Sequence, residues 1–300
     1  MDIRVLRYFL TIAREESFSR AAQALYLSQP TLSRQIRDME EELGVTLFVR
    51  TNRNLVLTKE GMRLRKRAQE IVELMDKTQS EFHALDDAFT GDVYIGAGET
   101  HIMRRIAQVA VALQKQHPGI HYHLFSGIAE DVKERLEKGL LDFGILIGDV
   151  DMHQYDFCNI PGKDTWGLLM RTDHPLSARD AIRRQDLDGL PLLLPRQEQG
   201  GHAVLDWFGN SFEQMNAVAT YNLFFNAAIM VEQGMGCALC LDHLIDTSAT
   251  SGLCFRPLYP ALEIGLHLVW KRNQILSPAA ELFLTSIQKA FSESKSDPPV

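Results

Sequence analysis

The chain has 300 residues, of which 45% are hydrophobic and 23% are charged, and its formal net charge is -8 at pH 7. This composition is typical of a globular protein with two or three domains, and no apolar run is long enough to span a membrane. The first ten residues, MDIRVLRYFL, carry charges where an export signal needs an apolar core, and four cysteines are too few for a disulfide framework. We therefore expect a cytoplasmic protein.

The negative charge is unevenly distributed along the chain. Residues 1–67 contain 13 Lys and Arg against 8 Asp and Glu, a net charge of about +5, which leaves about -13 for the remainder. Charges more than roughly 10 Å away are largely screened, so the local field of a basic module decides whether it attracts phosphates. The acidic total therefore does not exclude a nucleic-acid partner.

The N-terminal region has the spacing of three helices. Apolar residues at helical intervals predict a first helix around residues 6–13, and the stretch SFSRAAQAL predicts a second with Ser19 as its N-cap. In YLSQPTLSRQI, Ser28 is the expected N-cap of a third helix. Pro30 then lies in the first turn, where its missing N–H costs nothing, and Gly44 ends the helix.

The third helix has two different faces. Leu32, Ile36, Met39 and Leu43 form an apolar stripe. The opposite face is polar and cationic in its N-terminal half, which is the half of a recognition helix that enters the major groove of DNA. The residues expected to contact DNA from this helix are Ser28, Gln29, Pro30, Thr31, Ser33, Arg34 and Arg37. For the helix alone, a merely solvated polar face is an equally good interpretation.

A short hairpin follows the third helix. In LFVRTNRNLVLT, two apolar runs flank the turn Thr51–Asn54. A hairpin that carries arginines after a recognition helix is typical of a wing, so Arg50 and Arg53 are also expected to contact DNA. Three helices, a wing and local positive charge together favour a DNA-binding module over a solvated helix.

The stretch from Ser17 to Gly61 resembles the LysR-type transcriptional regulators. The matching residues are Ala21-Ala22, Gln29-Pro30, Ser33-Arg34, Ile36, Glu40, Leu43-Gly44, Leu47-Phe48-Val49-Arg50 and Leu57-Thr58-Lys59-Glu60-Gly61. Met39 stands where the family usually has Leu. The length and domain order of the whole chain are also similar to this family.

Residues 59–89 predict a long linker helix. Its apolar positions alternate in steps of four and three, with Thr78 as the polar exception: Leu64, Ala68, Ile71, Met75, Thr78, Phe82, Leu85 and Phe89. Such a seam can pair with a second copy or pack on its own domain. The resemblance implies pairing, in which a homodimer places two winged heads on one dyad-related site in double-stranded DNA, and commonly a homotetramer.

From Gly91 onward the pattern changes to short apolar strands that alternate with helices. DVYIGAG, IHYHLFSG and LDFGILIG predict strands, with helices over 102–116 and 128–139, an order that favours a parallel sheet. WGLLMR, PLLLP, CALCL and LHLVWK predict later strands, and NLFFNAAIMVEQGMG and PAAELFLTSIQKAF predict helices. The predicted fold class is therefore multidomain α/β.

This region carries no phosphate-binding or catalytic motif that we recognise. GAGETH lacks the spacing of a dinucleotide-binding loop, and G-x-S-x-G and H-E-x-x-H are absent. His121 and His123 share one strand face, but two histidines without a third ligand are more often ordinary strand residues. We expect no enzyme activity, no cofactor and no metal site.

The resemblance implies a C-terminal effector domain like the periplasmic binding proteins, with a small molecule between two α/β lobes. Ligands of open α/β sheets bind at the carboxyl ends of the strands. The expected effector-binding residues are Glu99, Thr100, His101, Ser126, Gly127, Ile128, Gly148, Gln199, His202, Tyr221 and Asn222. Helix starts near Thr100 and Ile128 suit an anionic effector, which Glu99 would oppose unless it points away, and nearby aromatic residues suit a ring.

Cys237 and Cys240 raise the alternative of a redox switch. They lie in CALCL, which reads as a buried strand, and positions three apart on a strand point to opposite faces. Core packing is therefore the favoured interpretation.

The sequence predicts three parts: a winged helix-turn-helix over 1–58, a linker helix over 59–89 and an effector domain over 90–300. Within the last, lobe I comprises about 90–161 and 266–300, and lobe II about 162–265. We expect a regulator whose promoter binding responds to a small molecule, with RNA polymerase as a candidate partner. A small-molecule carrier and an α/β enzyme are the alternatives.

Overall fold

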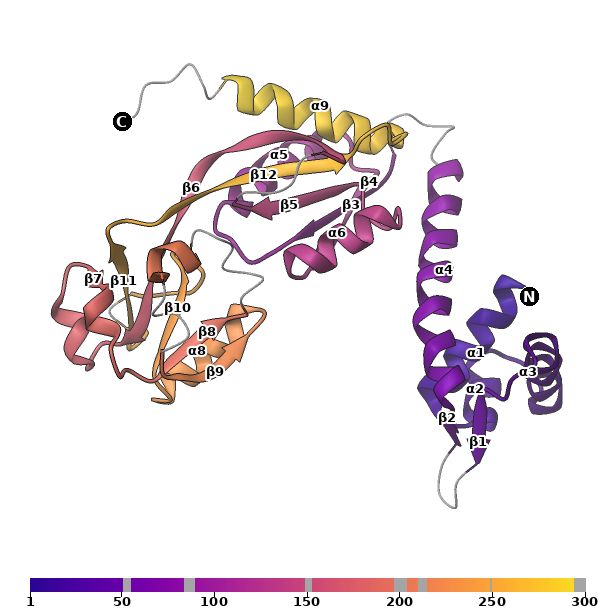
Figure 1. Ribbon diagram of the computed structural model, residues 1–300. Helices are drawn as coiled ribbons and strands as arrows, with labels where there is room; N and C mark the ends of the chain where they lie inside the picture. Colours follow the sequence, from indigo (N-terminus) through magenta and orange to yellow (C-terminus); the bar gives the residue numbers. More distant parts are fainter. Residues whose placement is uncertain are drawn as a thin grey trace. The chain divides into compact units, whose positions relative to one another are not determined.

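The computed structural model describes residues 1–50, 55–83, 90–148, 153–196, 204–209, 215–248 and 250–293. They fall into two compact units, Met1–Phe82 and His83–Val300 (Figure 1). The first is mainly helical and the second mixes helices with sheet, which confirms the predicted multidomain α/β class. Within these residues, every helix is too short or too polar to cross a membrane.

The first unit contains the three predicted helices, the hairpin strands and the start of the long helix. Its elements are α1 (Ile3–Glu15), α2 (Phe18–Ala24), α3 (Gln29–Leu43), β1 (Phe48–Arg50), β2 (Leu55–Leu57) and α4 (Lys59–His83). Their apolar faces meet in one core that includes Leu6, Phe9, Leu32, Ile36 and Ala68. The strands pair antiparallel, with Val49 opposite Val56. The turn between them, including Arg53, lies outside the described residues.

Capping residues set where these helices begin and end. The Ser28 side chain accepts a hydrogen bond from the Thr31 N–H at 3.3 Å, and Gly44 ends α3 with a φ of 67°, as predicted. The prediction for α2 was wrong: Ser17 is its N-cap and accepts from the Arg20 N–H at 3.4 Å. Because α2 already begins at Phe18, Ser19 lies inside its first turn.

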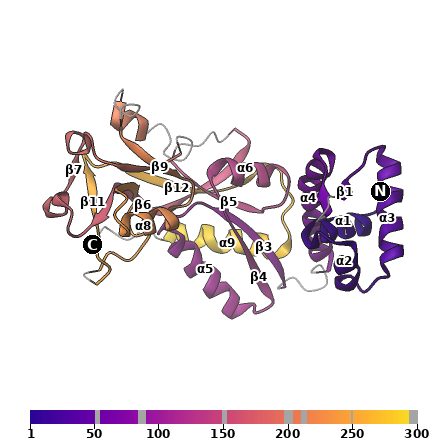
Figure 2. The same cartoon turned by 90° about the horizontal axis from the view of Figure 1, so that it is seen from below.

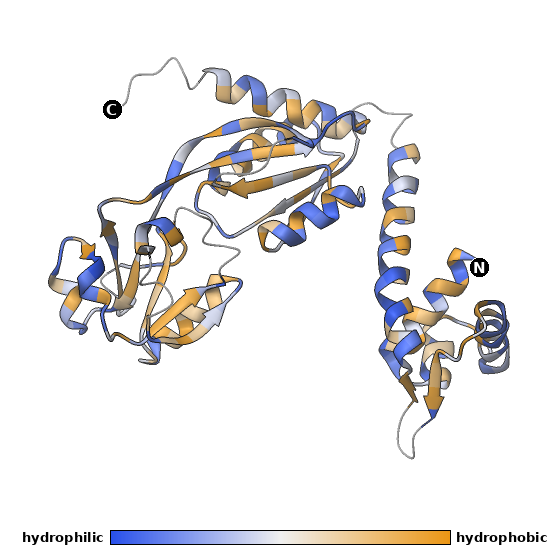
Figure 3. Cartoon of the chain, viewed as in Figure 1, coloured by the Kyte–Doolittle hydropathy of each residue, from blue (hydrophilic) through white to orange (hydrophobic). Residues whose placement is uncertain are grey.

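Two expected apolar stripes divide into buried and exposed parts. On α3, Leu32, Ile36 and Met39 are buried, but Leu43 is 40% exposed because the last turn extends past the core. On α4, Ala68 is fully buried in the core of the first unit. Ile71, Met75 and Phe82 are 40%, 37% and 68% exposed, and orange and blue segments alternate along α4 in Figure 3. Leu85 and Phe89 lie outside the described residues.

The second unit begins with the predicted β-α-β-α-β segment. It consists of β3 (Gly91–Ala97), α5 (Met103–Gln116), β4 (Ile120–Ser126), α6 (Ala129–Glu137) and β5 (Phe143–Ile147). The strands form a parallel sheet, as predicted, and their order in it is β4-β3-β5. Helix α5 and the last helix, α9 (Pro278–Glu293), cover one face of the sheet, and α6 covers the other (Figures 1 and 2). We call this part lobe I.

Lobe II is a second sheet with its own cores. It contains β7 (Ile182–Arg183), β8 (Leu192–Pro195), β9 (Ala217–Tyr221), α8 (Phe224–Glu232), β10 (Cys237–Leu241) and β11 (Leu253–Tyr259), with 3₁₀ turns η2 (Pro175–Ala178) and η3 (Arg184–Leu187). β8, β9 and β10 run parallel. The sequence analysis missed β9 and β11, which carry little apolar alternation.

Two long strands run through both lobes. β6 (Tyr155–Arg171) pairs with β12 (Glu263–Lys271) in lobe I, then continues into lobe II, where it pairs with β10 and β11 (Figure 1). The register between β6 and β12 shifts between Ile264 and Leu266, where the chain passes from one lobe to the other. The carboxyl ends of β3 and β4 and the start of α8 line a pocket between the lobes, which is described below.

Candidate functional site

Helix α3 presents a polar surface opposite its buried stripe. Thr31, Arg34 and Arg37 are exposed, and Gln29 and Ser33 are partly buried. Pro30 lies in the first turn, and the Ser28 and Thr31 hydroxyls are 2.7 Å apart. The expected DNA-contacting residues of this helix therefore lie at its N-terminal half. Helix α3 is largely blue in Figure 3.

The acidic end of α3 is not uniformly solvated. Asp38 lies 3.9 Å from Arg34 in an exposed pair, an interaction that is worth little in water. Glu40 instead turns toward the hairpin, where its Oε1 accepts hydrogen bonds from Leu47 N–H at 2.6 Å and Phe48 N–H at 3.3 Å. The structure shows that Glu40 holds the start of the wing strand on α3.

The far side of the wing is joined to α4 by a tight contact. Thr58 Oγ1 donates to the Thr46 carbonyl at 2.7 Å and accepts from the Gly61 N–H at 2.9 Å. A Cβ atom at Gly61 would lie 2.2 Å from the Leu47 carbonyl oxygen, so only glycine fits this approach. Arg50, exposed at the end of β1, is therefore presented by a strand that is fixed from both sides.

A pocket of about 460 Å³ lies between lobe I and lobe II. Its apolar lining consists of Ile95, Ala97, Met103, Ala107, Leu124, Phe125, Phe224, Phe225, Leu244 and Ile245. Its polar side chains are Glu99, Thr100, His101, Arg104, Ser126 and His243. A cavity of this size with a mostly apolar wall and a few polar groups is typical of a small-molecule site.

Four of the expected effector-binding residues line this pocket: Glu99, Thr100, His101 and Ser126. The lining does not include Gly127, Ile128, Gly148, Tyr221 or Asn222. The Tyr221 side chain packs instead in the lobe II core, where its hydroxyl donates to the Leu239 carbonyl and its ring contacts Phe224. Asn222 Oδ1 accepts from the Leu223 N–H, and Gly148 faces the Ile264 side chain. Gln199 and His202 lie outside the described residues.

The aromatic residues expected near an effector divide into two groups. Phe224 and Phe225 line the pocket, so a ring-bearing ligand would meet aromatic walls from lobe II. Phe208 is fully buried in the lobe II core, and Trp207 Nε1 donates to the Pro260 carbonyl at 2.8 Å. Leu124 and Arg104, which the sequence analysis did not select, complete the lobe I wall.

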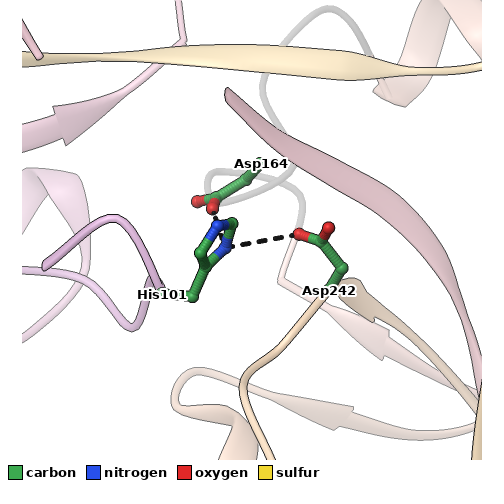
Figure 4. Close-up of side chains that lie close together, drawn as sticks. All are labelled: His101, Asp164 and Asp242. Carbon is green, nitrogen blue, oxygen red and sulfur yellow. Dashed lines mark ion pairs between the residues drawn. The ribbon is translucent and has the colours of Figure 1, made fainter. Parts of the chain in front are cut away.

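A polar cluster lies beside the pocket, where the chain crosses between the lobes. Asp164 on β6 is fully buried, and its Oδ2 accepts a hydrogen bond from Thr100 Oγ1 at 2.6 Å. His101 Nδ1 lies 2.7 Å from Asp164 Oδ1 and 3.5 Å from Asp242 Oδ1 (Figure 4). Burial raises the pKa of Asp164, and the Thr100 hydrogen bond and His101 act in the opposite direction. The sequence analysis missed this cluster because its three members lie in different segments.

The cysteines are packed in the lobe II cores. Cys237 lies in the core cluster on one face of β10, and Cys240 in the cluster on the other face, which confirms their opposite orientation. Burial raises the pKa of the Cys237 thiol to about 11 and that of Cys240 further. Both thiols are therefore protonated at neutral pH, which disfavours thiolate chemistry.

Comparison with protein families identifies both units. Residues 3–62 match the model of the bacterial regulatory helix-turn-helix proteins of the lysR family, and residues 86–292 match the LysR substrate binding domain. The chain belongs to the LysR family. It is a LysR-type, DNA-binding transcriptional regulator with an effector-binding substrate domain, so the family resemblance read from Ser17–Gly61 is confirmed.

Relatives cover nearly the whole chain at low identity. The Hca operon transcriptional activator HcaR of Escherichia coli (strain K12) is 26% identical over 97% of this chain and 99% of the relative. The hydrogen peroxide-inducible genes activator of Dickeya chrysanthemi is 28% identical over 96% of this chain and 95% of the relative. Full-length CbnR in complex with its target DNA has a TM-score of 0.76 at 19% identity, covering 97% of this chain and all of that one. The CbnR structure supports the fold of the LysR family.

Proposed function

We propose that this LysR-family regulator binds a dyad-related promoter site as a homodimer or homotetramer and responds to a small molecule in the pocket between its lobes. The observation that carries this proposal is the presence, on one chain, of a capped helix with an exposed cationic face and a pocket walled by both lobes. A ligand shifts assembly or DNA binding only if it binds two states of the protein with different affinity.

The proposed DNA-contacting residues belong to α3 and to the wing predicted from the sequence. We propose that Arg34 and Gln29 bond base edges, since Arg pairs with guanine and Gln with adenine in the major groove. Ser28, Thr31, Ser33 and Arg37 would serve phosphates or bases, and Pro30 shapes the first turn. From the wing, Arg50 and Arg53 would reach the DNA backbone or minor groove.

A promoter-binding assay tests this part of the proposal. DNA upstream of the protein's own gene is titrated with the full chain at several salt concentrations, and affinity should fall steeply as salt rises. Arg34→Ala should cost about 1–3 kcal/mol at its preferred base and relax sequence preference, while Arg37→Ala should weaken all sequences alike. Unchanged affinity and preference in Arg34→Ala would show that α3 does not read DNA through this residue.

The pocket favours an effector with an apolar, ring-sized body and a polar end. Phe224 and Phe225 supply aromatic contacts, and Ser126 and Arg104 supply donors. Glu99 does not point away from lobe II, because its carboxylate accepts the Phe224 N–H at the start of α8. An anionic group would therefore have to bind toward Arg104 and away from Glu99.

A thermal-shift screen of metabolites on the full chain tests the effector site. A true effector should raise the melting temperature in a concentration-dependent way, because it binds the folded state only. Ser126→Ala and Phe225→Ala should reduce that shift while DNA binding without effector is retained. A compound whose shift is unchanged in both variants binds elsewhere.

The remaining parts of the proposal concern assembly, location and activity. The exposed apolar residues of α4 would pair with a second copy, and RNA polymerase is a candidate partner at the promoter. We infer a cytoplasmic protein without catalytic activity or an organic cofactor, because it belongs to a family of transcriptional regulators.

A further inference from the structure

Three side chains from distant segments bring potential metal ligands together beside the pocket. His101 lies just before α5, Asp164 is on β6, and Asp242 directly follows β10 (Figure 4). One ligand atom from each residue lies within 4.8 Å of those from the other two. Among the described residues, no other group of three or more His, Cys, Asp or Glu side chains has this spacing.

Ordinary hydrogen bonds leave two of these atoms unsatisfied. His101 Nδ1 and Asp164 Oδ1 are both buried and face each other at 2.7 Å, and neither atom makes a well-directed hydrogen bond to a described residue. Ligands of a shared metal ion have this relation, because each points at the ion and not at its neighbour.

The burial of Asp164 provides an independent indication of a ligand. Its side chain is 0% exposed, and its Oδ1 has only the contact with His101 Nδ1 described above. A buried carboxylate is costly unless it is hydrogen-bonded, paired or bound to a cation. The nearest groups besides His101 are the Thr100 hydroxyl, which serves the other oxygen, and the carboxylate of Asp242, which repels it.

We propose that His101 Nδ1, Asp164 Oδ1 and Asp242 Oδ1 bind one divalent first-row transition-metal ion. Metal–nitrogen and metal–oxygen bonds of about 2.0–2.2 Å place neighbouring ligand atoms roughly 3 Å apart. The two separations from His101 Nδ1, 2.7 and 3.5 Å, lie on either side of that value. An imidazole with two carboxylates suits Zn²⁺ or Mn²⁺ better than Ca²⁺ or Mg²⁺, which prefer oxygen ligands alone.

Neighbouring groups hold the two carboxylates in place. Thr100 Oγ1 donates to Asp164 Oδ2 at 2.6 Å, and the Thr165 N–H donates to Asp242 Oδ1 at 3.0 Å. Such contacts orient metal ligands and are typical of built sites. Three protein ligands leave coordination positions open, and His101 also lines the pocket, so the ion would lie where an effector approaches. The ion adds to the proposed effector response and does not depend on it.

Direct metal binding tests the proposal. The full chain is freed of metal with a chelator and titrated with Mn²⁺ by electron paramagnetic resonance and with Zn²⁺ by calorimetry. We expect one ion per chain, bound at least tenfold more weakly by His101→Gln and by Asp242→Asn. His123→Gln is the matched control, because His123 Nε2 also contacts a carboxylate, Asp92 Oδ1 at 3.0 Å, but this pair belongs to no group of three potential metal ligands among the described residues.

Further measurements distinguish loss of the metal site from unfolding and from loss of DNA binding. His101 is 22% exposed, so His101→Gln should keep the circular dichroism and melting temperature of the metal-free protein. Absence of Mn²⁺ and Zn²⁺ binding by the native chain overturns the proposal. Equal binding by native protein and folded His101→Gln also overturns it, since the ion then lies elsewhere. Promoter binding is measured in parallel without metal, and its loss would count against the proposed function and not against the metal site.

Discussion

The carboxylate of Glu99 in lobe I accepts a hydrogen bond from the backbone N–H of Phe224, the first residue of α8 in lobe II. Helix α8 has Leu223 as its N-cap and therefore has no side-chain cap of its own. Glu99 supplies the missing acceptor, and its negative charge lies at the positive end of the helix dipole. One residue thus caps a helix and joins the two lobes.

Replacing Glu99 should loosen the start of α8. We expect Glu99→Ala to reduce stability by about 1 kcal/mol, the usual cost of a lost N-cap, and Glu99→Gln to cost less because it keeps an acceptor. Hydrogen exchange of the amides of Phe224 and Phe225 should be faster in Glu99→Ala. Glu130→Ala, which removes an exposed carboxylate from the first turn of α6, should leave α8 exchange unchanged. Native protection in Glu99→Ala would argue against the cap.

Glu40 offers a second test, within the DNA-binding unit. Because its Oε1 accepts two backbone N–H groups at the start of the wing, Glu40→Ala should destabilise this unit by about 2–3 kcal/mol and weaken DNA binding. Its neighbour Glu41 is exposed, so Glu41→Ala serves as the control and should change stability by less than about 0.5 kcal/mol. Urea unfolding followed by circular dichroism measures both. Equal effects of the two substitutions would contradict the role of Glu40.

Local patterns predicted much of this fold because they depend on neighbours in the chain. Ser28 and Gly44 bound α3 through contacts within one helix, and periodic apolar residues identified β3, β4 and β5. Contacts between distant segments have no such signal. Glu40 looks like any surface acid until the hairpin folds against it.

The pocket between the lobes could also be predicted only in part. Rules for strand ends identified Glu99, Thr100, His101 and Ser126, which do line the pocket. They could not identify Asp164 or Asp242, because the approach of these residues depends on how β6 and β10 cross between the lobes.

The exposed apolar side of α4 predicts the assembly state. Ile71 and Met75 are 40% and 37% exposed, which suits an interface with a second copy. Ile71→Glu and Met75→Glu together should convert the proposed dimer to a monomer in light scattering after gel filtration, because a carboxylate is costly to bury unpaired. Gln69→Glu, which adds one negative charge at an exposed position on another side of the helix, should leave the proposed dimer intact. A dimer that persists in the double variant would exclude this surface as the interface.

Because the thiols of lobe II are buried, we expect the protein to be insensitive to oxidants. Because burial raises the pKa of the Cys237 thiol to about 11, the thiol is mostly protonated at pH 8, so its alkylation should be slow there and become faster toward pH 11. Native alkylation followed by mass spectrometry should label Cys237 and Cys240 at least a hundredfold more slowly than in denatured protein. Mild peroxide should leave promoter binding unchanged. A disulfide between these two cysteines after peroxide would refute the prediction.

Strand β6 has a consequence for how this protein can be divided. Its 17 residues belong to two sheets, with β12 beside it in the first and β10 and β11 beside it in the second. A fragment that contained only one lobe would have to be cut through β6, which would leave unpaired edges that favour aggregation. Neither lobe can therefore be transplanted alone into a chimeric sensor, and the shortest exchangeable cassette is the whole stretch from β3 to α9.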